Sequence, residues 1–426
     1  MTFSTLPKNA TKIQLSEGFE SFPEELFAYK ETLEILDLSR NKLSELPSNF
    51  NEFKKLKIAF FSENDFEVFP EILGKCPSLT MIGFKSNRIN YISENALPKN
   101  LQWLILTDNQ IECLPNSIGS CLYLQKCALA GNKLKSLPVS MSNCLKLELL
   151  RVSANKMTNI PFWLLELPRL AWLAIDGNPC SKNRKIDQLN LDEIDYNTLL
   201  IQKKIGEGAS GFIHIAKSII SNKLFALKTF KGEVTSDGYP IDELENSLLA
   251  GRHENIVPLL GPFINHPESK SGIVMDLIPS NYSTLGFPPS LESCTRDVFE
   301  ESMKLSSELV YKIACSVANA SLHLHSNGVM HGDLYAHNIL YDPTTGHAFL
   351  GDFGASTHYE IKSETAKYFE RLDVRAYGYL LDDLIRLSMD YSKHVSVLEE
   401  IRLLSLGENV LERPSFKEIV SILEGT

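Results

Sequence analysis

Asparagine returns at a nearly constant interval through the first half of this 426-residue chain. Successive copies are 22 or 23 residues apart, and each closes a pattern such as Leu33-x-x-Leu36-x-Leu38-x-x-Asn41. The seven copies are Asn41, Asn64, Asn87, Asn109, Asn132, Asn155 and Asn178. A repeat of this length predicts stacked coils, because one coil cannot bury its own apolar side and depends on its neighbours.

The alternating leucines predict one short strand in each coil, with every second side chain pointing inward. The strands of successive coils are then expected to stack into a parallel sheet. At the end of each strand, the asparagine amide can bond backbone groups of the neighbouring coils. We therefore predict that these asparagines are structural and not catalytic.

This pattern resembles the leucine-rich repeat family, which implies an α/β solenoid over residues 1–181 and a linker or cap over residues 182–199. Such arrays bind protein partners on the concave strand face. The residues six positions before each asparagine are mostly apolar: Ile35, Ile58, Met81, Trp103, Lys126, Leu149 and Trp172. Two interpretations stay open. The column is an exposed partner-binding stripe anchored by Trp103 and Trp172, or neighbouring coils cover it.

Composition excludes several classes of protein. The net charge is -11 and no stripe of Lys and Arg stands out, which argues against nucleic-acid binding. Residues 1–12 lack the apolar core of a signal peptide, and no apolar run is long enough to span a membrane. We therefore expect a cytoplasmic chain without a membrane span.

Eight cysteines are present, none of them in a CxxC pair. Cys76, Cys121 and Cys144 occupy the same position of the repeat, eleven residues before an asparagine. Because free cysteine is often a small buried side chain, we predict that these three lie in the core.

In the second half, glycines at Gly206, Gly208 and Gly211 separate two strand-like segments. Glycine lets backbone amides approach phosphate oxygens closely. The segment that follows, residues 212–216, is strand-like and not helical, which favours a kinase lid over a dinucleotide-binding site.

Lys228 ends the strand-like stretch Phe225-Ala226-Leu227-Lys228 and is suited to hold nucleotide phosphates. Such a lysine needs a carboxylate to orient it, and the helical segment 241–249 offers two. We favour Glu245. Glu243 is the alternative, because the spacing from the helix to His253 is uncertain by a residue.

The segment Val329 to Leu340 contains His331-Gly332-Asp333 and Asn338, and Asp352-Phe353-Gly354 follows fourteen residues after Asn338. A carboxylate at Asp333 can orient or deprotonate an acceptor hydroxyl. Oxygen donors at Asn338 and Asp352 suit Mg²⁺, which bridges nucleotide phosphates.

Residues 200–426 resemble the eukaryotic-type protein kinases, nearest to their tyrosine-kinase-like branch. The resemblance implies a two-lobed α+β fold, ATP and Mg²⁺ as cofactors, and an adenine pocket formed by Met275 and the backbone of Asp276 and Ile278. The whole chain then resembles a leucine-rich-repeat protein kinase with two different domains. The expected activity is phosphorylation of Ser or Thr on a protein substrate, with the repeats recruiting the partner.

Three departures from the family pattern leave alternatives open. Gly332 replaces the usual Arg that binds a phosphate of the activation loop, which suggests activity without loop phosphorylation. Tyr335 replaces the usual Lys near the γ-phosphate, and only 21 residues separate Asp352 from Asp373. A pseudokinase scaffold and a small-molecule phosphotransferase therefore remain as alternatives.

Overall fold

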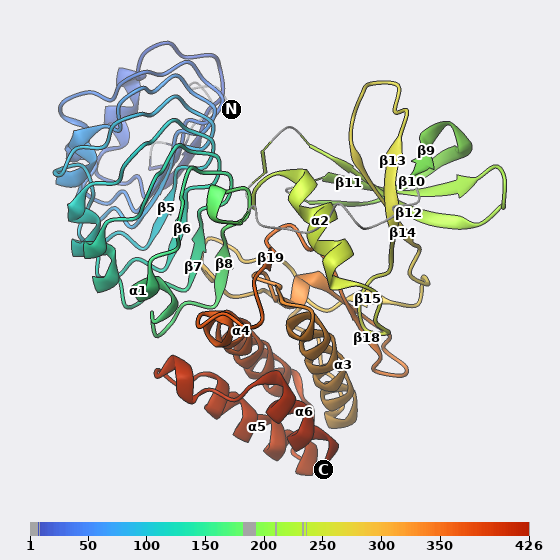
Figure 1. The fold of residues 1–426 in the computed structure, drawn as a ribbon. Helices are drawn as coiled ribbons and strands as arrows, with labels where there is room; N and C mark the ends of the chain where they lie inside the picture. The colour runs from blue at the N-terminus through green and yellow to red at the C-terminus, as the bar shows by residue number, and fades with distance from the viewer. Residues whose placement is uncertain are drawn as a thin grey trace. The chain divides into compact units, whose positions relative to one another are not determined.

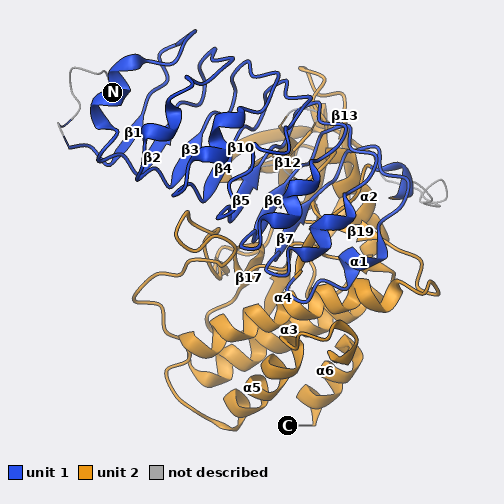
Figure 2. Cartoon of the chain, turned by 90° about the vertical axis from the view of Figure 1, so that its left-hand side faces the viewer, with its two compact units in different colours: residues 1–169, 178–180 blue, residues 170–177, 181–426 orange. Residues whose placement is uncertain are grey.

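The computed structural model describes residues 7, 9–181, 193–208, 211–231, 234–235 and 237–425. They form two compact units, Met1–Arg169 with Asn178–Cys180, and Leu170–Gly177 with Ser181–Thr426 (Figure 2). Most of the expected linker, residues 182–192, lies outside the described residues. In the described part of the chain, no helix is both long and apolar enough to cross a membrane.

The first unit is built from one repeated coil. A short strand in each coil pairs in parallel with the strand of the next coil, so the strands follow one another in chain order (Figure 1). The strands are β1 (Lys12–Gln14), β2 (Ile35–Asp37), β3 (Ile58–Phe60), β4 (Met81–Gly83), β5 (Trp103–Ile105), β6 (Lys126–Ala128) and β7 (Leu149–Arg151). This confirms the predicted parallel sheet.

Short helical turns return the chain to the next strand. Most of them follow the apolar residue and proline of the repeat, and proline is well suited to the position just before a turn or at its start. They are η2 (Glu24–Tyr29), η3 (Phe50–Glu52), η4 (Glu71–Lys75), η5 (Asn116–Ser120), η6 (Val139–Asn143) and α1 (Phe162–Leu165).

The repeated asparagines form a ladder of hydrogen bonds between coils. The Asn132 side-chain oxygen accepts from the amide of Ile111 at 3.0 Å, and its Nδ2 donates to the carbonyls of Leu106 at 2.8 Å and Leu129 at 2.9 Å. Equivalent bonds recur at the other coils. The predicted structural role is confirmed, because these amides satisfy backbone groups that are buried from water.

The repeat cysteines and most of the apolar column are buried in the first unit. Cys76, Cys121 and Cys144 are buried as predicted. Of the two interpretations of the column, the structure supports coverage by neighbouring coils: Trp103 is 7% exposed, and Lys126 lies over its ring at 4.2 Å from the centroid. Since parallel in-register strands place Met81, Trp103 and Lys126 side by side, the column covers itself.

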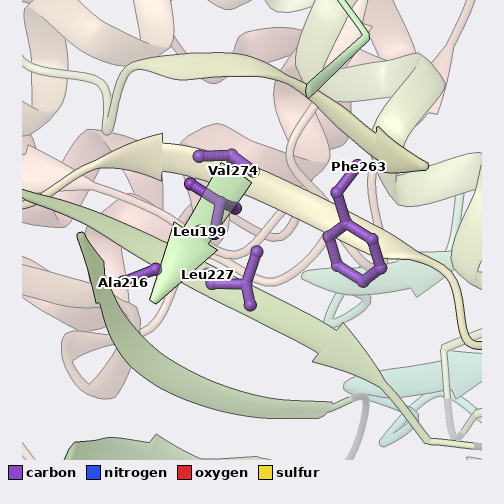
Figure 3. Close-up of a cluster of buried hydrophobic side chains, with 5 residues drawn as sticks. All are labelled: Leu199, Ala216, Leu227, Phe263 and Val274. Carbon is purple, nitrogen blue, oxygen red and sulfur yellow. The ribbon is translucent and has the colours of Figure 1, made fainter. Parts of the chain in front are cut away.

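The second unit contains a six-stranded sheet in the order β10-β11-β12-β14-β13-β9. These strands are β9 (Ile194–Asp195), β10 (Leu199–Glu207), β11 (Gly211–Ser218), β12 (Leu224–Phe230), β13 (Leu259–Ile264) and β14 (Gly272–Asp276). Five buried side chains pack on this sheet, as Figure 3 shows: Leu199, Ala216, Leu227, Phe263 and Val274. Helix α2 (Pro240–Ala250) connects β12 to β13.

The rest of the second unit is mainly helical (Figure 1). Its helices are α3 (Ser307–Ser326), α4 (Ala366–Leu387), α5 (Lys393–Ser405) and α6 (Phe416–Glu424). Short strand β15 (Ser283–Thr284) precedes α3. Four short strands between α3 and α4 flank the loops of the candidate site: β16 (Val329–Met330), β17 (Ile339–Tyr341), β18 (Ala348–Leu350) and β19 (Thr357–His358). Strand β8 (Trp172–Ala174), the last of the repeated strands in sequence, also belongs to this unit.

Candidate active site

Lys228 lies on β12 and points to two carboxylates. Its ammonium is 2.5 Å from an oxygen of Glu243 on α2 and 3.4 Å from an oxygen of Asp352. Lys228 and Glu243 are both buried. The structure therefore corrects the expected partner, because Glu243 and not Glu245 contacts Lys228.

The start of α2 explains this difference. Pro240 occupies the first turn of the helix, a position that proline favours, and it places Glu243 in that turn beside the sheet. A helix turns by about 100° per residue, so Glu245 lies about 200° further around. The proline was the sequence signal that could have fixed the helix start and selected Glu243.

Charge holds the lysine in its protonated form. Burial by itself would lower the pKa of Lys228, but the negative charges of Asp352 and Glu243 outweigh that effect and raise the pKa. The ammonium is therefore available to bind anionic oxygen atoms. Asp352 keeps part of its carboxylate accessible, since its side chain is 43% exposed.

The glycine loop joins β10 to β11, and the amide of Gly208 donates to the carbonyl of Gly211 at 3.0 Å. A Cβ on Gly211 would lie 2.6 Å from the carbonyl oxygen of Thr229, so the close β11–β12 pairing requires glycine there. A Cβ on Gly208 would meet no atom within 4 Å, and one on Gly206 would make only ordinary contacts. Ala209 and Ser210, the tip of the loop, lie outside the described residues.

Lys231 was missed by the sequence argument. Its ammonium is 2.6 Å from a Glu207 oxygen and 3.2 Å from the carbonyl oxygen of Gly208. It therefore adds a second positive charge at the glycine loop. The sequence offers no sharper signal for it than its position three residues after Lys228.

Asp333 and Asn338 lie close together between β16 and β17. Asn338 donates from Nδ2 to the Asp333 carboxylate and to the Asp333 carbonyl, both at 2.9 Å. The Asp333 amide in turn donates to Nδ1 of His331 at 3.2 Å. These bonds fix the carboxylate of Asp333 in one position.

Asp373 on α4 holds the start of this loop. Its buried carboxylate accepts from the amide of His331 at 2.6 Å and from the amide of Gly332 at 3.0 Å. His325 adds a third contact at 2.9 Å. The sequence places Asp373 21 residues after Asp352, but the contacts by which it anchors this loop join it to residues more than forty positions away.

Two of the residues expected to contact adenine, Met275 and Asp276, lie on β14, which pairs with β12 in the sheet. Met275 on β14 pairs with Ala226, and its side chain packs against Phe230, Leu244 and Ile273. The amide of Asp276 already donates to the carbonyl of Pro258, so only its carbonyl could serve a bound base. Ile278 lies two residues after the end of this strand.

The oxygen donors fit a hard divalent cation. The amide of Gly351 donates to the carbonyl of Asn338 at 3.0 Å, which brings the segment of Asp352 beside Asn338. One carboxylate and one amide oxygen suit Mg²⁺, which completes its shell with water and phosphate. Among the described residues, no cluster of three or more His, Cys, Asp or Glu side chains offers an all-protein metal cage.

Residues 199–395 match the family described as the protein kinase domain. The second unit contains a protein kinase domain. This confirms the kinase part of the expectation.

The similar relatives are protein kinases by name. The Drosophila melanogaster serine/threonine-protein kinase PITSLRE is 30% identical over 46% of this chain and 19% of its own length. The Saccharomyces cerevisiae glycogen synthase kinase-3 homolog YGK3 is 29% identical over 50% of this chain and 55% of its own length. A probable serine/threonine-protein kinase of Dictyostelium discoideum, gdt4, is 30% identical over 45% of this chain and 11% of its own length. The chain thus spans about half or less of the length of these relatives.

The kinase domain also accounts for Trp172, one of the expected partner anchors. Trp172 is 1% exposed and stacks on Tyr335 with 4.3 Å between ring centroids. Its Nε1 donates to the carbonyl of Leu334 at 3.2 Å. The expectation of an exposed anchor at Trp172 is therefore wrong, because the indole is already buried against the loop that carries Asp333.

Proposed function

We propose that this chain is an ATP- and Mg²⁺-dependent protein kinase that phosphorylates Ser or Thr hydroxyls. One observation carries the proposal. Lys228 is paired with Glu243 and lies 3.4 Å from Asp352 in the unit that also holds the hydrogen-bonded Asp333 and Asn338. Phosphoryl transfer needs this combination of a fixed cation, metal ligands and a carboxylate for the acceptor.

The roles follow from the chemistry of these groups. The acceptor oxygen forms a bond to the γ-phosphorus of ATP while the bond to the β–γ bridging oxygen breaks and ADP leaves. The hydroxyl proton passes to Asp333, whose orientation is set by Asn338. Lys228 binds phosphate oxygens and is itself held by Glu243. Mg²⁺ at Asn338 and Asp352 would neutralise the charge of the phosphates.

Several finer features belong to the same proposal. The relatives named as serine/threonine kinases favour Ser and Thr over Tyr. Three further assignments rest on the sequence patterns. They are the tyrosine-kinase-like branch, the leucine-rich-repeat solenoid of the first unit, and the domain limits 1–181, 182–199 and 200–426. In this proposal, the repeats recruit a protein partner or substrate, without Trp103 or Trp172 as an exposed anchor because both are buried.

A scaffold with little or no transfer is the second candidate. It is favoured by Tyr335, because this aromatic residue stands where kinases usually place a lysine and stacks on Trp172. No cation at that position assists the γ-phosphate. A small-molecule phosphotransferase is the third candidate, and it is favoured by the 21 residues between Asp352 and Asp373.

The decisive experiment incubates the purified chain with γ-labelled ATP and Mg²⁺, with and without a generic protein acceptor. Asp333→Asn is compared with wild type and with Asp65→Asn, a surface change at an Arg88 ion pair in the first unit. We expect label transfer by wild type and Asp65→Asn and a loss of at least about 100-fold in Asp333→Asn. Equal labelling by Asp333→Asn, or no labelling by wild type, would reject the kinase assignment.

A further inference from the structure

Residues 170–177, which cluster with the second unit, contact the loop that carries Asp333. Gly332 adopts a φ of +70°, a conformation that other residues rarely adopt. A Cβ at Gly332 would lie 2.5 Å from the carbonyl oxygen of Leu173 and 2.7 Å from that of Ala355. The arginine usual at this position therefore cannot be accommodated while segment 170–177 lies where it does.

The second departure from the kinase pattern meets the same segment. Tyr335 stacks on Trp172 with 4.3 Å between the ring centroids and only 7° between the ring planes. The ring centroid of Tyr379 on α4 lies 5.2 Å from that of Trp172. Trp172 also donates its indole N–H to the carbonyl of Leu334. Stacked aromatic pairs and a buried hydrogen bond together restrict the backbone directly after Asp333.

The same segment reaches α2 through a buried hydrogen bond. Asn246 is 0% exposed, and its Nδ2 donates to a carboxylate oxygen of Asp176 and to the carbonyl of Ser356, both at 2.6 Å. Both partners are acceptors, so the amide must turn its NH₂ group toward them. The bond to Asp176 joins two buried side chains, so losing this acceptor would leave a buried N–H of Asn246 with one partner fewer.

Asn246 lies three residues after Glu243, so both point from neighbouring positions on the same side of α2. The N-terminal end of the helix is held as well. A Cβ on Gly177, which has a φ of +76°, would lie 2.7 Å from the ring of Tyr239, the residue before α2. Segment 170–177 thus fixes the helix that presents Glu243 to Lys228.

We propose that residues 170–177 are a built-in positioning element of the kinase domain. Asp176 holds α2 so that Glu243 pairs with Lys228, and Trp172 holds the loop around Asp333. In this proposal, these contacts do the work of a phosphate on the activation segment. The arginine that usually binds such a phosphate is replaced by Gly332 in this chain. The inference rests on the proposed kinase function and names how its site is kept competent.

The sequence supports a special role for Asp176. The position two residues before each repeated asparagine holds Ser39, Ser62, Lys85, Thr107, Ala130, Ser153 and Asp176. Asp176 is the only acidic residue of this column, and it occurs in the coil that clusters with the kinase domain. In the structure, this acid accepts a hydrogen bond from Asn246 of α2.

The test compares Asp176→Leu with the conservative Asp176→Asn, whose amide oxygen can still accept from Asn246. Asp65→Leu serves as a matched control on an exposed ion pair of the first unit. Protein shown by mass spectrometry to be unphosphorylated at the start is used throughout. Steady-state kinetics with varied ATP give kcat and KM, and hydrogen exchange of residues 240–250 without nucleotide reports on α2.

We expect Asp176→Leu to lower kcat/KM for ATP by about 10- to 100-fold and to speed exchange in α2 by at least about tenfold. Asp176→Asn should stay within about threefold of wild type in both measurements, and Asp65→Leu should leave both unchanged. If α2 in Asp176→Leu exchanges as in wild type, the positioning inference is rejected even where turnover falls.

Trp172→Phe provides a second variant that keeps an aromatic ring beside Tyr335 but removes the bond to Leu334 and part of the buried indole. We expect a lower kcat and faster exchange at residues 331–338, with α2 unaffected. Unchanged kcat and unchanged exchange at these residues would remove Trp172 from the proposal. If wild type transfers no phosphate while Asp176→Leu still loosens α2, the proposed function fails and the positioning role survives.

Discussion

Glu243 contacts Lys228 at 2.5 Å, and both side chains are buried between α2 and β12. A buried pair of this kind depends on both partners, because removing one leaves the other charge without compensation. The contact distinguishes two acidic residues of one helix, Glu243 and Glu245, of which the sequence analysis favoured the wrong one.

Glu243→Gln should therefore reduce ATP use, whereas Glu245→Gln should not. We expect kcat/KM for ATP to fall by at least about tenfold in Glu243→Gln, because Lys228 loses its charged partner. Glu245→Gln, the matched control on the same helix, should stay within about threefold. Steady-state assays with varied ATP check this, and equal losses in the two variants would contradict the assignment.

Phosphoryl transfer should require magnesium, and Asp352 should determine the Mg²⁺ concentration that gives the half-maximal rate. Removing divalent cations with EDTA should abolish transfer, and adding Mg²⁺ should restore it. Asp352→Asn keeps an oxygen donor but loses its charge, so we expect half-maximal rate at a Mg²⁺ concentration at least about tenfold higher. Rates are measured across a Mg²⁺ titration. Undiminished transfer in EDTA would show that no divalent cation takes part.

Gly332→Ala should destabilise the protein. Its Cβ would lie 2.5 Å from the Leu173 carbonyl oxygen, and the φ of +70° is itself unfavourable for alanine. We expect a loss of about 1–3 kcal/mol in the free energy of unfolding. Gly208→Ala, where a Cβ meets no atom within 4 Å, should cost less than about 0.5 kcal/mol. Thermal unfolding of both variants checks the difference, and equal Tm shifts would contradict it.

Asn132→Ala should weaken the asparagine ladder. The change removes three hydrogen bonds and leaves the amide of Ile111 and two carbonyls buried without this partner. We expect a loss of about 2–4 kcal/mol, whereas Asn100→Ala at an exposed asparagine should cost less than about 1 kcal/mol. Urea unfolding gives both values. Similar stability of the two variants would mean that the ladder contributes little.

The repeat cysteines should resist alkylation in the folded protein. Burial raises the pKa of Cys121 to about 11 and that of Cys144 to about 12, so at pH 8 roughly a thousandth or less of either thiol is ionised. Cys113 is exposed. Iodoacetamide at pH 8 should modify Cys113 first and the buried pair only after unfolding, as peptide mass spectrometry can show. Equal rates in native protein would contradict the buried core.

Features that depend on local or periodic spacing were predictable. The structural role of the repeated asparagines, the parallel strands and the burial of the repeat cysteines all follow from a period that every coil shares. The residues Lys228, Asp333, Asn338 and Asp352 were also identified, because each stands in a short motif of its own. Their assigned roles remain predictions for the experiments above.

The sequence by itself determined the repeated coil and the set of motifs in the kinase domain. The tertiary structure decided which side chains meet: Glu243 with Lys228, Asp176 with Asn246, and Trp172 with the carbonyl of Leu334, 162 residues away. The reason is physical. A helix turns each successive side chain by about 100°, and contacts between distant segments depend on packing that no local pattern encodes.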